Sequence, residues 1–261
     1  MSLEKTHAII EIDSSQRTKG TIDDFEVILN HPIYLNKDRQ YFVRIEGIRF
    51  PTSFYNIDSN YNTLRITEDP AGSPSTFNIT IDEGNYTITE LLLELKSALD
   101  DGTGKSNEWT LSINDKTGKV SISADTTTFK IIGSNSLLNR PLGFEPDTDY
   151  TSGGLVDSLY TLISVNHINM STKRYIKINS DITSNNHYSK EFIEPIGCIV
   201  PITEARSTIQ YYANDNGYKV KMANKHNIKH LSFNIRDGNN NKVDTNGVEW
   251  NAELVIYEFR S

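Results

Sequence analysis

Residues 83–102, E-G-N-Y-T-I-T-E-L-L-L-E-L-K-S-A-L-D-D-G, form the one stretch of this 261-residue chain with a clear helical pattern. Thr87 and Glu90 stand three residues apart at its start, which is the spacing of a capping box. Five apolar side chains follow at helical spacing, namely Ile88, Leu91, Leu92, Leu95 and Leu99. Gly102 can end the helix in the left-handed conformation. Because these side chains form one complete apolar stripe, we expect the helix to lie on a sheet.

Short alternating segments on both sides of the helix can supply that sheet. They are residues 77–81, 109–113 and 120–122. Residues 114–119, N-D-K-T-G-K, separate the last two and predict a hairpin turn. Residues 139–154 contain two prolines and three glycines, which is typical of a loop or linker. The sequence therefore predicts an inserted α+β domain at 71–154 with its own core, within a body made of 1–70 and 155–261.

The body is predicted to contain eight strands, because eight segments outside the insertion carry strand-like patterns. They are residues 7–13, 24–29, 40–50, 173–182, 196–202, 208–213, 227–236 and 249–259. Within 40–50 the apolar phase switches at Gly47, which predicts a β-bulge or a kink. The apolar run 159–165 is interpreted as a connector. Eight antiparallel strands suit a two-sheet jelly roll. The predicted fold is mainly β: a single jelly-roll sandwich with a small α+β insertion carrying one helix.

Composition excludes several classes of protein. The net charge of −8 argues against a chain that grips nucleic acid through a basic face. A single cysteine excludes an intrachain disulfide and a four-thiolate zinc site. The N-terminal residues lack the apolar run of a signal peptide, and no segment approaches the roughly 18–20 apolar residues of a membrane span. We expect a protein made in a cytoplasm, with no membrane span and no nucleic-acid partner.

Two groups of residues could suggest a metal site. His226 and His230 have the i, i+4 spacing that holds zinc on a helix, but their surroundings predict a strand, where they would lie about 13 Å apart. Residues 237–247, D-G-N-N-N-K-V-D-T-N-G, are rich in carboxylates and amides like a calcium loop. They lack the EF-hand order and a closing Glu, so a polar hairpin is the preferred interpretation. We therefore expect no metal.

Other side chains could suggest catalysis. Carboxylate pairs at 23–24, 100–101 and 11/13 fall at predicted element ends, where solvated carboxylates are ordinary. Cys198 sits in an apolar strand and is interpreted as an inert core thiol. There is no Gly-x-Ser-x-Gly elbow, and 102–105 lacks the spacing of a phosphate-binding loop. We expect no catalytic residue, no cofactor and no enzyme activity. A hydrolase using dispersed carboxylates is the weakest alternative.

Tyrosine is abundant, with 13 residues. Tyr211-Tyr212 and the region of Tyr55 and Tyr61 could stack on sugars or bases, or could anchor a protein interface, where tyrosine is enriched. We favour the interface for a multimeric β protein.

Several short segments resemble the penton and minor capsid proteins of virophages, Polinton-like viruses and related double-stranded DNA viruses. They are I-E-I-D-S-S-Q-R-T (10–18), D-F-E-V-I-L (24–29), Q-Y-F-V-R-I-E-G-I-R-F-P-T-S-F-Y-N-I (40–57), I-D-E-G-N-Y-T-I-T-E-L-L-L-E-L (81–95), R-P-L-G-F (140–144), K-R-Y-I-K-I-N-S-D-I (173–182), H-L-S-F-N-I-R-D-G (230–238) and E-L-V-I-Y-E-F (253–259). The resemblance spans most of the chain.

This resemblance implies a structural virion protein. Such proteins are single jelly rolls that form homopentamers at icosahedral fivefold vertices, beside the major capsid protein, and some carry an outward insertion that contacts a host receptor or a fibre. The alternative is a fibre-head or lectin-like β-sandwich that binds a glycan or host receptor, using the tyrosines and the polar tips at 103–107 and 239–246. The resemblance would place the protein in the virion, as part of the capsid.

Overall fold

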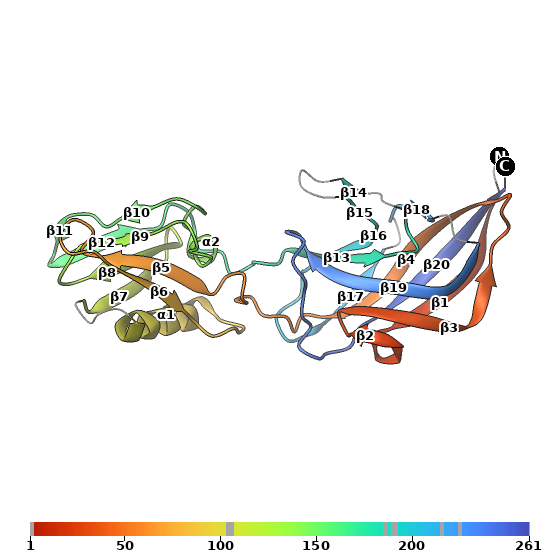
Figure 1. Ribbon diagram of the computed structural model, residues 1–261, viewed down its shortest axis with the longest axis horizontal. Helices are drawn as coiled ribbons and strands as arrows, with labels where there is room; N and C mark the ends of the chain where they lie inside the picture. Colours follow the sequence, from red (N-terminus) through yellow and green to blue (C-terminus); the bar gives the residue numbers. More distant parts are fainter. Residues whose placement is uncertain are drawn as a thin grey trace. The chain divides into compact units, whose positions relative to one another are not determined.

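The computed structural model describes residues 3–102, 107–184, 187–188, 193–214, 217–223 and 226–260. It is mainly β, with several antiparallel sheets (Figure 1). The chain divides into two compact units, unit 1 at Met1–Phe54 and Lys173–Ser261, and unit 2 at Tyr55–Thr172. Of the predicted polar tip at 103–107, residues 103–106 lie outside the described part of the chain. Within that part, no helix is long and apolar enough to cross a membrane.

The first sheet of unit 1 has the strand order β1-β20-β4-β17, with β18 also paired to β4. Its strands are β1 (Leu3–Asp13), β20 (Asn251–Arg260), β4 (Gln40–Pro51), β17 (Ile209–Ala213) and β18 (Val220–Lys221). The predicted bulge is confirmed, because the β20–β4 register shifts between Glu253, opposite Gly47, and Leu254, opposite Ile45. The extra residue, Glu46, lets Ile45 and Ile48 both reach the core.

The second sheet of unit 1 has the order β16-β13-β19-β3-β2. Its strands are β16 (Ile196–Pro201), β13 (Tyr175–Ser180), β19 (Asn227–Asp237), β3 (Asp24–Tyr34) and β2 (Lys19–Thr21). A 3-10 turn, η1 (Ser14–Gln16), follows β1, and a two-stranded hairpin joins β14 (His187–Tyr188) to β15 (Ile193–Glu194). The eight predicted body strands are all present, as β1, β3, β4, β13, β16, β17, β19 and β20.

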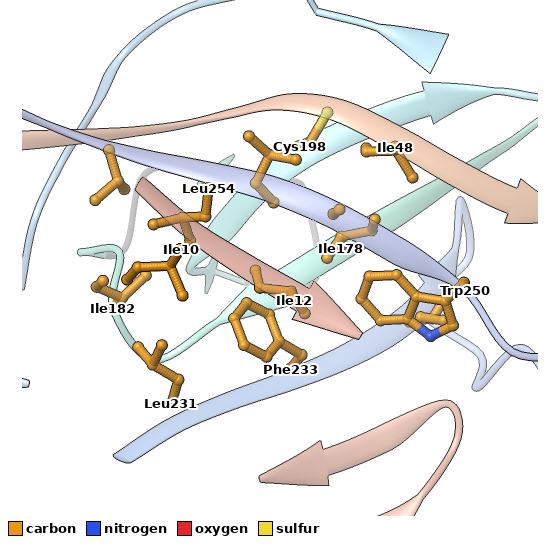
Figure 2. Close-up of a cluster of buried hydrophobic side chains, with 14 of the residues drawn as sticks. Ile10, Ile12, Ile48, Ile178, Ile182, Cys198, Leu231, Phe233, Trp250 and Leu254 are labelled. Carbon is orange, nitrogen blue, oxygen red and sulfur yellow. The ribbon is translucent and has the colours of Figure 1, made fainter. Parts of the chain in front are cut away.

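One apolar core fills unit 1, and both sheets contribute to it. Figure 2 shows Ile10, Ile12 and Leu254 from the first sheet together with Ile178 and Phe233 from the second. Trp250, fully buried just before β20, packs near the ring of Phe25 with centroids 5.5 Å apart. Its indole N–H donates to the carbonyl oxygen of Ile22 at 2.9 Å, which satisfies its polar atom inside the core. The apolar residues that alternate along the strands of both sheets therefore meet in one shared core.

Unit 2 has two smaller antiparallel sheets and two helices. The first sheet, in the order β10-β9-β5-β6, uses β10 (Tyr150–Thr151), β9 (Phe129–Ile131), β5 (Thr63–Glu68) and β6 (Ser75–Thr80). The second, in the order β11-β12-β8-β7, uses β11 (Leu155–Val156), β12 (Leu159–Ile163), β8 (Lys119–Ala124) and β7 (Trp109–Asn114). The helices are α1 (Ile88–Gly102) and the short α2 (Asn139–Leu142). The prediction of one helix is therefore wrong, and the range 139–154, predicted as a loop or linker, contains both α2 and β10.

Helix α1 begins and packs as its sequence predicts. The backbone N–H of Thr87 donates to a carboxylate oxygen of Glu90 at 2.7 Å, and the N–H of Glu90 donates to the Thr87 hydroxyl at 3.3 Å. This is the reciprocal pair of a capping box. The buried stripe, Leu91, Leu92, Leu95 and Leu99, joins a core with Ile79 of β6, Trp109 of β7 and Ile122 of β8. The helix therefore packs in the core of unit 2, as predicted. The single sheet predicted from 77–81, 109–113 and 120–122 is wrong, because β6 belongs to one sheet of unit 2 while β7 and β8 belong to the other.

The boundaries predicted for the insertion, 71–154, are too narrow, since unit 2 spans Tyr55–Thr172. Strand β5, which the sequence assigned to the body, pairs with β6 and β9 and buries Leu64 and Ile66 in the second core. The run 159–165, interpreted as a connector, contains β12, which pairs with β8. A boundary at 70 or 155 would cut these ladders, so the body is correspondingly smaller than 1–70 and 155–261.

Candidate interaction surface

The histidines considered for zinc do not converge with other ligands. His230 lies on β19 opposite Ile28 of β3, and His226 lies just before the start of β19. Both side chains are exposed. Within the described ranges, no group of three or more His, Cys, Asp or Glu side chains could hold a metal ion.

Asp237, the first residue of the calcium-like loop, closes the turn after β19. Its carboxylate accepts hydrogen bonds from the backbone N–H groups of Asn239 at 2.9 Å and Asn241 at 2.8 Å, and from the Asn241 side-chain amide at 3.1 Å. The residue is almost fully buried, so these donors replace the water that the carboxylate loses. The Asp237 carboxylate therefore stabilises a polar hairpin.

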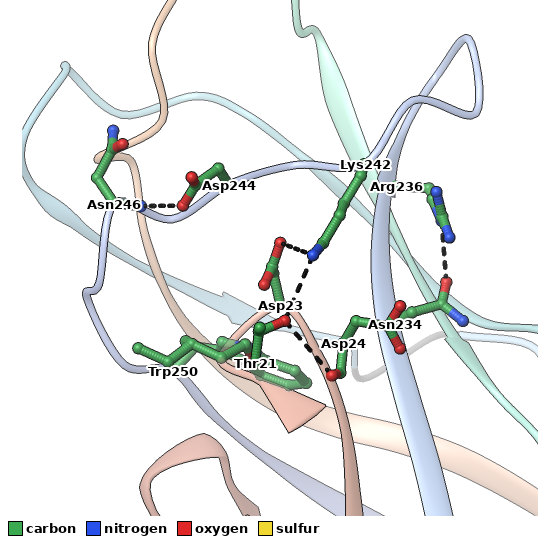
Figure 3. A network of polar contacts seen from close by, with 10 residues as sticks. Thr21, Asp23, Asp24, Asn234, Arg236, Lys242, Asp244, Asn246 and Trp250 are labelled. Carbon is green, nitrogen blue, oxygen red and sulfur yellow. Dashed lines mark hydrogen bonds and ion pairs between the residues drawn. The ribbon is translucent and has the colours of Figure 1, made fainter. Parts of the chain in front are cut away.

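The predicted carboxylate pairs also have structural partners. Buried Asp23 forms an ion pair with Lys242 Nζ at 3.2 Å, and Lys242 also lies 3.4 Å from the Thr21 hydroxyl (Figure 3). Asp100 forms an ion pair with Lys96 at 2.5 Å on α1. Asp13 accepts a hydrogen bond from the N–H of Ser15 at 2.8 Å and so caps η1. Each of these three side chains holds a local segment of the chain.

Cys198 is buried in the core of unit 1. Burial raises the pKa of its thiol from 9.0 to about 12, because the apolar surroundings disfavour the thiolate. A thiol that stays protonated at neutral pH is a poor nucleophile.

The tyrosines divide into buried and exposed groups. Tyr61 is buried in the core of unit 2 and cannot serve as a stacking platform, whereas Tyr55 is partly exposed. Tyr212 is mostly covered, and burial raises the pKa of its phenol. Tyr211 is 73% exposed on the edge strand β17, and Tyr218 is 94% exposed. Tyr211 and Tyr218 are the most exposed of these five tyrosines, and they lie on or near the β17 edge of the first sheet.

We define the β17 side of unit 1 as four exposed apolar or aromatic side chains: Ile199, Ile209, Tyr211 and Tyr218. Ile199 and Tyr218 also line a groove of 640 Å³ between β16 and residues 217–221. A Cβ atom on Gly47 would lie 3.3 Å from the Tyr211 hydroxyl, so the ring of Tyr211 lies over the bulge of β4. Exposed aromatic and apolar side chains on or near edge strands, here β16 and β17, are typical of a protein contact surface.

A charged cluster on the outer face of the first sheet was not predicted from the sequence. Arg44 and Glu46 of β4 are 2.5 Å apart, and the Tyr257 hydroxyl of β20 hydrogen-bonds to Glu46 and lies 3.1 Å from Arg44. The hydrogen bond from Tyr257, and then that from Arg44, lowers the pKa of Glu46. Burial, followed by the hydrogen bond to Glu46, raises the pKa of Tyr257. In the sequence, this cluster is indicated only by the way Arg44 and Glu46 alternate with the apolar core residues of β4.

Lys219 extends this cluster towards the β17 side. Its ammonium lies 4.1 Å from the ring centroid of Tyr257 and 5.9 Å from that of Phe259, both within cation–π range. The rings of Phe42 and Phe259 meet edge to face at 4.8 Å. These contacts hold residue 219 on the sheet, next to the exposed ring of Tyr218.

Unit 2 has an exposed apolar segment of its own, the β11–β12 hairpin. Leu155 and Val156 are both exposed, Val156 by 67%, although they pair with β12. The turn residues Asp157 and Ser158 both have positive φ, as a tight two-residue hairpin turn requires. Ile163 of β12 is exposed as well. This hairpin is a second candidate contact surface.

The comparisons with known proteins agree with this β architecture. A family model described as a family of unknown function (DUF5901) matches residues 3–245, and the chain belongs to that family. No curated protein matches the sequence. A solved structure, the crystal structure of the selenomethionine-labelled mavirus penton protein, is similar over 100% of both chains, with a TM-score of 0.54 and 11% identity. The likeness shows that the two proteins share a fold.

Proposed function

We propose that unit 1 is a single jelly roll. Numbered along the chain, its eight long strands lie in the order first, eighth, third, sixth in one sheet and second, seventh, fourth, fifth in the other. This strand order is the one expected of a jelly roll, in which two Greek keys form a sandwich of two antiparallel sheets. The short strands β2 and β18 extend the two sheets without changing this order.

The protein acts, on this proposal, as a structural virion protein: a penton-type capsid protein that assembles as a homopentamer at icosahedral fivefold vertices. The observation that carries the proposal is the likeness of the fold to the mavirus penton protein, which extends over all of both chains. A capsid protein of this kind needs no catalytic residue, cofactor or metal, and we propose that this chain uses none.

A ring of five copies requires a heterologous contact, in which two different surfaces of each copy meet. The β17 side is the favoured first surface, because Tyr211 and Tyr218 offer large, rigid anchors at little entropic cost. The outer edge of β1, where Ile9 is exposed, is the favoured second surface, since β1 is the strand at the opposite end of the same sheet. The neighbouring major capsid protein would contact other faces.

Unit 2 is the part that we propose faces outward from the virion. Its exposed β11–β12 hairpin supports a contact with a host receptor or a fibre. The alternative function, a fibre-head or lectin-like sandwich that binds a glycan, also uses exposed rings, so Tyr211 and Tyr218 are relevant to both.

Light scattering after size exclusion tests self-association. The wild-type chain is expected at five times the mass of 29.5 kDa, and Tyr211→Ala is expected to shift the mass towards the monomer. Tyr34→Ala is the matched control, because Tyr34 is equally exposed but lies at the end of β3. A monomer at high concentration contradicts the pentamer, and saturable glycan binding lost in Tyr211→Ala favours the alternative.

A further inference from the structure

A small pocket of 160 Å³ lies in unit 1, and one of its lining residues, Lys221, also lines the groove beside Tyr218. The connection from β3 to β4 and the start of β4 form one wall, through residues 35–37 and 39–41, and Lys221 at the end of β18 forms the other with residues 222–223. His226, just before β19, completes the lining. Two parts of the chain that are distant in the sequence, the β3–β4 connection and the residues around the end of β18, therefore converge on one cavity.

The floor of this pocket is fixed by the core and by hydrogen bonds. Leu35, Tyr41 and Met222 are buried members of the unit 1 core. The backbone N–H of Leu35 donates to the carbonyl of His226 at 2.9 Å, and that of Met222 donates to the carbonyl of Tyr41 at 3.1 Å. The Tyr41 hydroxyl accepts a hydrogen bond from the N–H of Asn36 at 3.1 Å. These bonds hold the walls in register without any ligand.

The lining of the pocket is basic, in a chain whose net charge is −8. Lys37, Arg39, Lys221 and His226 all contribute to it, and none of the described residues that line it is a carboxylate. Arg39 is partly neutralised by Glu258, with 3.2 Å between Nη1 and Oε1. Neither Lys37 nor Lys221 forms an ion pair with any residue that the structure describes.

The polar groups beside these cations can also donate hydrogen bonds. Asn36 and Gln40 contribute side-chain amides, and the imidazole of His226 contributes a ring nitrogen. The nearest acid in the sequence, Asp38, is exposed on the turn, where its backbone N–H donates to the Asn36 side-chain oxygen at 2.9 Å. Asp38 does not line the pocket.

We infer that this pocket binds a compact oxyanion, a phosphate or sulfate group, held between Lys37 and Lys221. Two lysines on opposite walls, neither in an ion pair with a described residue and both beside amide donors, match the charge and hydrogen-bonding needs of such an anion. The volume admits a phosphate-sized group but leaves no room for a polypeptide segment. The bound anion would bridge the β3–β4 turn to β18 and so stabilise unit 1.

Titration calorimetry of the full chain with inorganic phosphate tests the inference, with methyl phosphate in a parallel arm to separate a free anion from a phosphate monoester. Saturable one-site binding is expected for the wild type. The double variant Lys37→Gln/Lys221→Gln is expected to bind about tenfold more weakly or worse, because two charged donors are lost. Lys116→Gln/Lys229→Gln, which removes equal charge from exposed lysines outside the pocket, is the matched control and should bind like the wild type.

A second measurement, of thermal stability, tests the inference if Lys37→Gln/Lys221→Gln is too unstable for calorimetry. Lys37→Arg/Lys221→Arg preserves both charges and is expected to retain binding, and phosphate should raise its midpoint of thermal unfolding relative to chloride at equal ionic strength. Sulfate and phosphate stabilise many proteins by exclusion, so the informative quantity is a difference between variants: phosphate should raise the midpoint less for Lys37→Gln/Lys221→Gln than for the arginine variant and the lysine control. Equal shifts for all three variants, or no saturable binding by the wild type, would overturn the inference.

Discussion

Replacing Leu95 by alanine should destabilise unit 2 and leave unit 1 unchanged. Leu95 is 0% exposed on helix α1 and packs in the core that contains Trp109 and Ile122. No residue of that core belongs to the core of unit 1. Leu93 provides a matched control on the same helix, because it is 63% exposed and undergoes the identical chemical change.

The size of the effect follows from burial. Truncating a fully buried leucine removes its transfer free energy and leaves a cavity, at a cost of about 2–5 kcal/mol. With a urea slope of about 2 kcal/mol per molar, the unfolding midpoint of unit 2 should fall by about 1–2.5 M. Leu93→Ala should change the free energy of unfolding by less than about 0.5 kcal/mol.

The chain contains its own two reporters for this assay. It has two tryptophans, Trp109 buried in unit 2 and Trp250 buried in unit 1. Urea unfolding followed by fluorescence in a Trp250→Phe background reports unit 2, and the same measurement in a Trp109→Phe background reports unit 1. Each leucine variant is compared with its parent in both backgrounds.

Two results would refute the reasoning. If Leu95→Ala lowers the midpoints seen by Trp109 and Trp250 equally, the helix belongs to one core shared by the whole chain. If Leu95→Ala and Leu93→Ala cost the same, the apolar stripe of α1 does not carry the packing of unit 2.

Three further outcomes are expected. Thr87→Ala should destabilise unit 2 by about 1 kcal/mol in the Trp109 assay, while Thr87→Ser should be nearly neutral, because serine also caps; equal losses would contradict the capping role. Since hydrogen bonds from Tyr257 and Arg44 lower the pKa of Glu46 below 4.5, its stabilising contribution is present above that pH and is lost as pH falls through the lowered value. The stability difference between wild type and Glu46→Gln should therefore shrink between pH 7 and pH 3 in urea titrations, and a constant difference would contradict this. Cys198, with a thiol pKa of about 12, should react slowly with a thiol reagent until urea unfolds unit 1; rapid labelling of the folded chain would show it accessible.

Local patterns predicted most of the individual elements. The alternation of apolar and polar residues located all eight long strands of unit 1, because strand period and burial on one face are local properties. The capping box and leucine stripe located α1, and the phase switch at Gly47 located the bulge of β4. Each of these signals lies within one segment of about a dozen residues.

Pairing between distant segments was harder to predict. Strand β5 and the run containing β12 were assigned to the wrong side of the boundary, because the partners that hold them, β6, β9 and β8, are visible only in the folded chain. The cluster of Arg44, Glu46 and Tyr257 joins residues 211 positions apart in the sequence. The basic pocket likewise depends on two distant parts of the chain, and Lys37 and Lys221 carry no motif that could have identified them.

The acidic residues that were considered for catalysis or metal binding have structural roles in the folded chain. Asp237 closes a turn, Asp23 pairs with Lys242, and Asp13 caps a 3-10 turn. Exposed apolar side chains are found at the β17 side and on the β11–β12 hairpin, and singly elsewhere, as at Leu93 of α1. This distribution suits a protein that acts by contacting other proteins.

The central claim is that the chain assembles as a ring of five copies. Electron micrographs of the purified full-length oligomer, classified without imposed symmetry, test it most directly. We expect class averages with fivefold rotational symmetry, in which Tyr211→Ala reduces the fraction of closed rings while Tyr34→Ala does not. Threefold particles, or single copies at every concentration, would contradict the claim.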